Sequence, residues 1–278
     1  MITTRDDPRV ELARKALGNV RVLPDHALPP RLLRLTDGRG CLYFAKQHDN
    51  RERYLREVQA YEAWGHHLVG HAPRLLGRHD STRTLLLTAV PGVPVDILAA
   101  GSHEEERAHH EAGRMVGMLH RATAGPRSGA IGAVLAQRLQ NWIDRAGSAT
   151  LISAEEHRRL NSYANVLART RMDSAVCHLD YQPRNWLLGD SFGICDFEHM
   201  RRDARIRDFA RLEFRHWQAA PQLRAAFFAG YGTPLNETEQ RLLESFGAIE
   251  AATALVRGHE QDDRHLITRG RSVLARLT

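Results

Sequence analysis

Residues 177–198 read CHLDYQPRNWLLGDSFGICDFE, and this is the most informative stretch of the chain. Two short apolar runs within it, Trp186–Leu188 and Phe192–Cys195, flank a Gly-Asp-Ser turn, which predicts an antiparallel β hairpin. Antiparallel pairing brings the start of the first run beside the end of the second. Asn185 precedes the first run and Asp196 follows the second, so we expect their side chains to converge.

The residue types at this meeting point suit phosphoryl transfer. Asn185 and Asp196 offer oxygen ligands, which Mg²⁺ prefers while it keeps waters or substrate phosphates. Asp180 lies in the loop that leads into the hairpin, where a carboxylate set back from the metal can orient a hydroxyl nucleophile. Such a transfer needs positioning and the neutralisation of charge. The alternative is a polar surface hairpin with unrelated acids, which requires several spaced positions to coincide by chance.

The N-terminal third of the chain predicts a small sheet with one main helix. Asp37-Gly38 between two apolar runs indicates a hairpin turn. Apolar residues at helical spacing predict a helix over 51–68. In chain order, we expect a short helix over 8–17, strands over 31–36 and 41–47, the helix over 51–68, and a second hairpin over 74–78 and 84–88.

From the Pro91–Pro94 break onward the pattern becomes mainly helical. Helices are expected over 104–122, 134–145, 154–171, 208–219, 222–230 and 236–258, with the hairpin over 185–196 as the one β element among them. This layout is α+β, because runs of strands and runs of helices are separate in the sequence. The break predicts an N-terminal lobe over 1–90 and a C-terminal lobe over 91–278.

Composition and charge narrow the class of protein. The chain has 278 residues and a formal net charge of +6, and its arginines are scattered along the sequence. No aromatic stacking motif accompanies them, so we expect no nucleic-acid partner. No apolar run is long enough to span a bilayer, and the polar N-terminus does not read as a signal peptide. The three cysteines form no C-x-x-C pair, so we expect a cytoplasmic protein without a membrane partner.

The motif HLDYQPRN at 178–185, followed by DFE at 196–198, resembles the aminoglycoside phosphotransferase family, small-molecule relatives of the protein kinases. The resemblance implies a bilobal protein-kinase-like fold, with a small sheet lobe that binds the nucleotide and a larger, mainly helical lobe for catalysis and substrate. It implies ATP and Mg²⁺ as cofactors. It also implies that Asp180 is the catalytic base and that Asn185 and Asp196 bind Mg²⁺.

The resemblance also bears on two loops: the catalytic loop at 178–185 and the stretch before Lys46 that would cover the nucleotide. The resemblance implies that His178 holds the catalytic loop, and Leu179 stands where the family usually has glycine, which is expected to change how the loop packs. No G-x-G-x-x-G precedes Lys46, so the glycine-free stretch Leu23–Pro30 is expected to cover the nucleotide. This absence argues against a kinase that acts on proteins.

The same family order implies a nucleotide site in the N-terminal lobe. Lys46 ends an apolar strand, where the family places the lysine that binds the α- and β-phosphates. Glu57, on the margin of the apolar stripe of the following helix, is expected to pair with it, and Glu52 and Glu62 are the alternatives. The backbone from Thr88 to Val90 is expected to bind adenine.

Carboxylates in the C-terminal part are candidates for binding a basic acceptor, because sites for polycationic antibiotics are lined by acids. The candidates are Glu198, Glu250, Glu260, Asp262 and Asp263. The alternative for the run 260–263 is a solvated helix end. The net charge of +6 argues mildly against a strongly cationic acceptor, although salt screens distant arginines.

The sequence therefore predicts an ATP-dependent kinase that phosphorylates a hydroxyl group of a small molecule. A basic antibiotic, such as an aminoglycoside or a tuberactinomycin-type peptide, is the leading acceptor, which would make the protein a resistance enzyme. A metabolic kinase for a sugar, an amino alcohol or a homoserine-like acceptor is the second hypothesis. The third is a nucleotide-binding pseudokinase that serves as an interaction module. Fold likeness alone does not choose between acceptors.

Overall fold

The computed structural model describes residues 7–277, which separate into two compact units. The first unit reaches to Ala108 and takes in the later segment His178–Arg201. The second consists of His109–Cys177 and the chain from Arg202 onward. The motif stretch after residue 178 therefore belongs to the same unit as the N-terminal sheet. The functional lobes expected over 1–90 and 91–278 stay a prediction.

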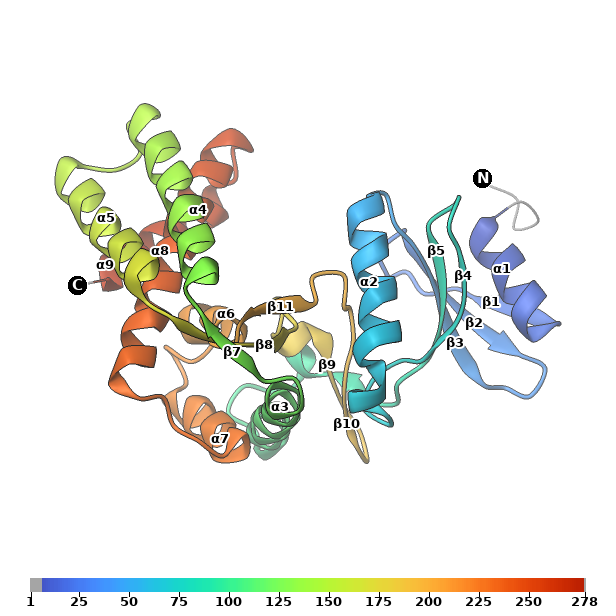
Figure 1. Ribbon diagram of the computed structural model, residues 1–278. Coiled ribbons are helices and arrows are strands. Elements are labelled where there is room, and N and C mark those ends of the chain that lie inside the picture. Colours follow the sequence, from blue (N-terminus) through green and yellow to red (C-terminus); the bar gives the residue numbers. More distant parts are fainter. Residues whose placement is uncertain (1–6, 278) are drawn as a thin grey trace. The chain divides into compact units, whose positions relative to one another are not determined.

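The first unit is built on a five-stranded antiparallel sheet in the order β1-β2-β3-β5-β4. Its strands are β1 (Val20–Leu23), β2 (Leu32–Asp37), β3 (Leu42–Gln47), β4 (Leu75–His79) and β5 (Thr84–Thr88). Helices α1 (Pro8–Leu17) and α2 (Arg51–Trp64) lie on opposite sides of it (Figure 1). On the α1 side, Leu12 and Ala13 pack with Ala45 of β3. Because neighbours in a strand point to opposite faces, Lys46 points toward α2.

The N-terminal elements expected from the sequence are confirmed, with one addition and one shorter helix. Strand β1 pairs antiparallel with β2, although no strand was expected over its four residues. A strand this short, followed directly by Pro24, gives little periodic signal. Helix α2 ends at Trp64, and the last expected residues form the 3-10 turn η1 (Gly65–Leu68). The low helix propensity of Gly65 accounts for this change.

The expected hairpin within 185–196 is confirmed. Strands β9 (Trp186–Leu188) and β10 (Phe192–Ile194) pair antiparallel, with Trp186 opposite Ile194. A two-residue strand, β6 (Val93–Pro94), extends this sheet on the β9 side. Two 3-10 turns, η2 (Val95–Ile97) and η3 (Pro183–Asn185), lie beside these strands in the chain. The start of β9 therefore lies beside the end of β10, as the sequence predicted.

The second unit is mainly helical, as expected. Helix α3 (His103–Ala122) begins in the other unit. The helices that follow are α4 (Gly129–Ser148), α5 (Ala154–Arg169), α6 (Arg207–Arg215), α7 (Pro221–Tyr231), α8 (Glu237–Glu260) and α9 (Arg264–Arg276). Within residues 7–277, no helix combines the length and the apolar character that crossing a membrane requires.

The expectation of a single β element in the C-terminal part was wrong. Strands β7 (Gly125–Ser128), β8 (Met172–Cys177) and β11 (Arg201–Ala204) form a further sheet in the order β11-β8-β7. Its central strand reads MDSAVC, in which two polar residues follow Met172, so it shows no regular alternation. Its edge strands read GPRS and RRDA, which carry no alternation of apolar and polar residues. Helix α9 was also not expected.

Glycines set the close contact between α3 and α7. A Cβ atom on Gly113 would lie 1.9 Å from the carbonyl oxygen of Phe227, and one on Gly230 would lie 1.9 Å from that of His110. The two helices therefore meet backbone to backbone, which only residues without a side chain permit. Neither glycine has a positive φ, so the space between the helices, rather than backbone conformation, requires them.

We predict that Gly113→Ala lowers the free energy of unfolding by about 1–3 kcal/mol, because the added methyl group must push α3 away from α7. Gly147→Ala in α4 is the matched control, since a Cβ there would meet its nearest neighbour at 3.8 Å. That substitution should raise the free energy of unfolding by up to about 1 kcal/mol, because alanine is the better helix former. Urea unfolding measures both changes. Equal effects of the two substitutions would contradict the close contact.

Candidate active site

Lys46 is the centre of a buried group of charges in the first unit. Its side chain is 3% exposed, and its Nζ lies 2.7 Å from Glu57 Oε2, 2.5 Å from Asp196 Oδ1 and 3.4 Å from Glu198 Oε2. These acids come from α2 and from the residues that follow β10. A buried ammonium without partners would be strongly unfavourable, and the three carboxylates offset this cost. The fold thus brings Lys46, Glu57 and Asp196 together.

Helix α2 settles which glutamate reaches the lysine. The glutamates at 52, 57 and 62 are spaced by five residues, so they point in different directions around the helix. Glu57 is completely buried. Glu52 instead pairs with Arg56 on the exposed surface, and Glu62 lies 2.9 Å from Arg78. Of the three, Glu57 is the one that contacts Lys46.

The charges of this cluster hold its carboxyl groups ionised. Burial by itself raises the pKa of Asp196, but the nearby Lys46 and Arg31 outweigh burial and lower that pKa to about 2. Burial also disfavours the charged form of Glu57, and Lys46 more than offsets it, so the pKa of Glu57 is lowered. For Lys46, burial acts to lower the pKa, whereas the surrounding acids raise it above its usual value. Lys46, Glu57 and Asp196 are therefore charged near neutral pH.

Two residues that the sequence did not point to complete the cluster. His48 is buried, with its Nε2 2.7 Å from Glu57 Oε2 and its Nδ1 3.8 Å from Glu198 Oε2. Arg31 donates to Glu198 Oε2 at 2.8 Å. A signal for His48 exists, because residues two apart along an extended chain share a face, and Lys46 precedes it by two. Arg31 carries no such local signal, because its partners lie far away in sequence.

Asp180 is held by its own loop. The side-chain amide of Gln182 donates to Asp180 Oδ1 at 2.6 Å, and Arg184 donates to Oδ2 at 2.7 Å. The Asn185 amide donates to Oδ2 at 3.0 Å and to the Asp180 carbonyl at 2.8 Å. These contacts fix the carboxylate, which is almost fully buried. Gln182 and Arg184 are further residues that the sequence reading did not single out.

The loop and the end of β10 are linked through His178. Its Nε2 lies 3.0 Å from the carbonyl oxygen of Cys195, and its ring packs against Tyr181 and Phe197. Leu179 follows with φ at 64°, in the left-handed region that favours glycine. Leu179, which replaces the family's usual glycine, therefore holds a backbone conformation that glycine would adopt more easily.

Asn185 and Asp196 flank the hairpin on neighbouring strands, and the Cys195 amide donates to the Asn185 carbonyl at 3.0 Å. Because the Asn185 amide nitrogen is used by Asp180, its Oδ1 atom is the group left to act as a ligand. With the Asp196 carboxylate this gives a set of hard oxygen donors, which fits Mg²⁺. The residues present therefore suit the metal that the sequence motif implies.

The segment expected to bind adenine has only part of its backbone available. The Thr88 amide donates to the Arg74 carbonyl at 3.0 Å, and the Ala89 amide donates to Leu42 at 3.1 Å. No hydrogen bond of the Val90 backbone is found among residues 7–277. A Cβ on Gly193 would lie 2.3 Å from Val90 Cγ1, so Val90 sits directly on β10. Among residues 7–277, the Val90 amide has no hydrogen-bond partner, whereas the Thr88 amide has one.

The carboxylates expected to bind an acceptor lie in two different surroundings. Glu198 is part of the Lys46 cluster. The others belong to the second unit, where Glu260 pairs with Arg145 and Glu250 pairs with Arg215. At the turn between α8 and α9, Asp262 has φ at 51°, and Asp263 caps α9 by accepting from the Leu266 amide at 3.0 Å. Pairing and capping thus account for most of these acids.

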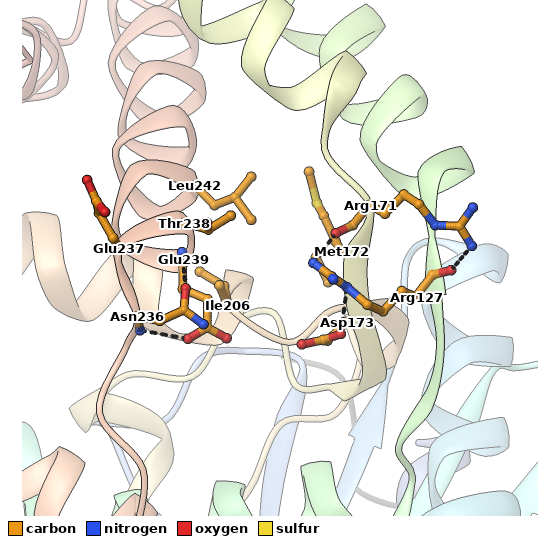
Figure 2. A pocket seen from close by; sticks show the side chains of 11 residues that line it. Arg127, Arg171, Met172, Asp173, Ile206, Asn236, Glu237, Thr238, Glu239 and Leu242 are labelled. Atoms are coloured by element: carbon orange, nitrogen blue, oxygen red, sulfur yellow. Dashed lines mark hydrogen bonds and ion pairs between the residues drawn. The ribbon is translucent and has the colours of Figure 1, made fainter.

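The second unit holds a separate pocket of about 320 Å³. Figure 2 shows its polar lining, which comes from β7, from Arg171 and the start of β8, and from Asn236 and the first turn of α8. Its charged groups contact one another: Arg127 lies 3.2 Å from Asp173 and donates to the Arg171 carbonyl, and Asn236 and Glu239 form a capping box. Because these groups already have partners, the pocket gives no sign of a particular ligand.

The chain matches a known family over most of its length. The model of the phosphotransferase enzyme family (APH) matches residues 19–244. No match was found among curated protein sequences.

Solved structures similar in fold include the following three. Macrolide 2′-phosphotransferase MphH from Brachybacterium faecium has a TM-score of 0.65 at 15% identity, over 95% of this chain and 96% of that one. The streptomycin–ATP–APH(2″)-IIa ternary complex has a TM-score of 0.64 at 14% identity, over 99% of this chain and 97% of that one. An aminoglycoside phosphotransferase from Alicyclobacillus acidocaldarius has a TM-score of 0.57 at 16% identity, over 92% of this chain and 91% of that one. At these identities the likeness concerns the fold, and it confirms the α+β kinase-like class expected from the sequence.

The low pKa of Asp196 predicts a pH-dependent stability. Since the folded pKa of about 2 lies below the ordinary 3.8, ionised Asp196 stabilises the fold above that ordinary value, and this contribution is lost as the pH falls from 3.8 to about 2. We expect Asp196→Asn to lower the free energy of unfolding by about 1–2 kcal/mol near neutral pH. Denaturant unfolding at several pH values should show this difference shrink below roughly pH 4.

The exposed Asp190 in the β9–β10 turn provides the control. Asp190→Asn should change the stability by less than about 0.5 kcal/mol at every pH. A difference between wild type and Asp196→Asn that stays constant down to about pH 3 would contradict the charge coupling with Lys46.

Proposed function

The chain belongs to the APH phosphotransferase enzyme family, and from this premise we propose that it transfers a phosphoryl group from ATP, with Mg²⁺, to a hydroxyl group of a small molecule. The observation that carries the proposal is the placement of Lys46, Glu57, Asp180, Asn185 and Asp196 in one compact unit. The ATP complex of a protein with a similar fold supports ATP as the donor. No nucleic-acid partner is proposed.

In this mechanism each residue has a role that its contacts support. Lys46, held by Glu57, which His48 also contacts, binds the α- and β-phosphates. Asn185 Oδ1 and the Asp196 carboxylate would hold Mg²⁺, which offsets the negative charge of the phosphates when bound. Asp180 orients the acceptor hydroxyl and takes its proton as the acceptor oxygen bonds to the γ-phosphorus and the bond from that phosphorus to ADP breaks.

The geometry around Asp180 favours an orienting carboxylate. Gln182, Arg184 and Asn185 donate to its oxygens, so its direction is fixed before an acceptor arrives. A fixed carboxylate lowers the cost of orienting the acceptor, which is the main contribution that a protein makes to phosphoryl transfer. The complete set of Lys46, Asp180, Asn185 and Asp196 also argues against a pseudokinase.

We propose a basic antibiotic as the acceptor, with resistance as the outcome. The names of the structural neighbours, aminoglycoside and macrolide phosphotransferases, support this class. A metabolic alcohol is the second candidate, and one observation favours it. Arginines already pair with Glu250 and Glu260, which lowers the negative charge available for a polycation.

A coupled assay of ADP release tests the function directly. The purified protein, ATP and Mg²⁺ are combined with aminoglycosides, a tuberactinomycin-type peptide, macrolides, or small metabolic alcohols. We expect one of these classes to stimulate ADP release and to gain a phosphoryl group by mass spectrometry. Binding of ATP without transfer to any acceptor would instead favour the pseudokinase.

Asp180→Ala should lower kcat by about 10²–10⁴-fold while leaving ATP affinity nearly unchanged, because Asp180 acts on the acceptor. Steady-state kinetics with the identified acceptor, together with ATP binding, measure the two effects. Asp190→Ala is the control from the same segment, since Asp190 is exposed and lies in the turn between β9 and β10. Full activity of Asp180→Ala would defeat the assignment.

A further inference from the structure

The connection between β1 and β2 has few backbone amides with which to hold phosphate. It runs from Pro24 to Arg31, reads PDHALPPR and contains no glycine. Its three prolines have no N–H group. Two further amides are turned inward, because Ala27 donates to Asp25 Oδ1 at 3.1 Å and Leu28 donates to the Asp25 carbonyl at 3.4 Å. Phosphate-binding loops rely on free N–H groups, and this connection offers few.

Arg31 stands at the end of this connection, beside the Lys46 cluster. Its carbonyl accepts from the Gln47 amide at 2.9 Å, which fixes its backbone beside the end of β3. Its guanidinium donates to Glu198 and comes within 3.7 Å of Asp196 Oδ2. The side chain is 33% exposed, so it reaches both the buried acids and the solvent. A guanidinium has five N–H groups, and these contacts leave some of them for a ligand.

The balance of charge shows why one cation is insufficient here. Lys46 is 3% exposed and already contacts three carboxylates, those of Glu57, Asp196 and Glu198. Its charge is therefore shared among these acids before a nucleotide arrives. A triphosphate adds further negative charge beside them. Arg31 is the second cation that contacts Asp196, and a planar guanidinium is well suited to bind phosphate oxygens in pairs.

We propose that Arg31 binds the phosphate groups of ATP, in place of the backbone amides that a glycine-rich loop supplies. Lys46 provides the buried cation of the nucleotide site and Arg31 a partly exposed one. The inference rests on the proposed function, because it assigns a further residue to the same nucleotide site.

Isothermal titration of Arg31→Ala with ATP, ADP and adenosine in the presence of Mg²⁺ tests the inference. The affinity for ATP should fall about tenfold or more, since hydrogen bonds between charged groups are lost. The affinity for adenosine, which has no phosphate, should not change. Arg31→Lys should restore part of the ATP affinity, because it keeps the charge and loses the paired hydrogen bonds.

Arg34→Ala is the matched control. Arg34 lies on β2 and pairs with Asp25 at 3.6 Å, and its side chain is 40% exposed. It makes no contact with Lys46, Asp196 or Glu198 among the ion pairs of residues 7–277. Its removal changes the surface charge of the same sheet by the same amount, and the affinity for ATP should stay as in the wild type.

The outcomes separate this inference from the proposed function. If the wild type binds ATP and Arg31→Ala binds it equally tightly, the inference fails and the function stands. An equal loss of ATP and adenosine affinity would also overturn the inference, because it would show that Arg31 supports the fold of the site. A wild type that binds no ATP would overturn both. If Arg31→Ala does not fold by circular dichroism, Arg31→Gln carries the same comparison.

Discussion

A lysine side chain with almost no access to solvent must be compensated by acids, and three carboxylates compensate Lys46. They come from positions far apart in the sequence, on α2 and after β10. Without these partners Lys46 would be a buried charge left uncompensated, which typically costs about 3–5 kcal/mol. The electrostatics of Lys46 therefore ties the sheet, the helix and the motif stretch into a single unit. In the proposed function, these charges would meet the magnesium nucleotide.

The backbone around this cluster carries strain that the fold maintains. Leu179 and Asp196 both have positive φ, at 64° and 68°. Each such residue costs about 1 kcal/mol or more. The contact of His178 with the Cys195 carbonyl and the contacts of Asn185 with Asp180 hold these segments in place. Leu179 precedes the proposed base Asp180, and Asp196 is itself a proposed Mg²⁺ ligand, so the strain lies at the proposed site.

Local patterns were enough to predict the β9–β10 hairpin. The hairpin that separates Asn185 from Asp196 followed from two apolar runs around a turn. The α3–α7 contact, the sheet of β7, β8 and β11, and the cluster around Lys46 depend on contacts between distant segments. Short strands without alternation, such as β7, give no periodic signal. Arg31 was missed because its partners, Asp196 and Glu198, lie far from it in the sequence.

The central claim is that one metal–nucleotide site is formed by Lys46, Asn185 and Asp196. A crystal structure with Mg²⁺ and a non-hydrolysable ATP analogue tests it most directly. The account predicts a metal ion bound by Asn185 Oδ1 and the Asp196 carboxylate, with Lys46 Nζ on the phosphates. A metal ion held by other residues, or a nucleotide bound away from Lys46, would contradict it.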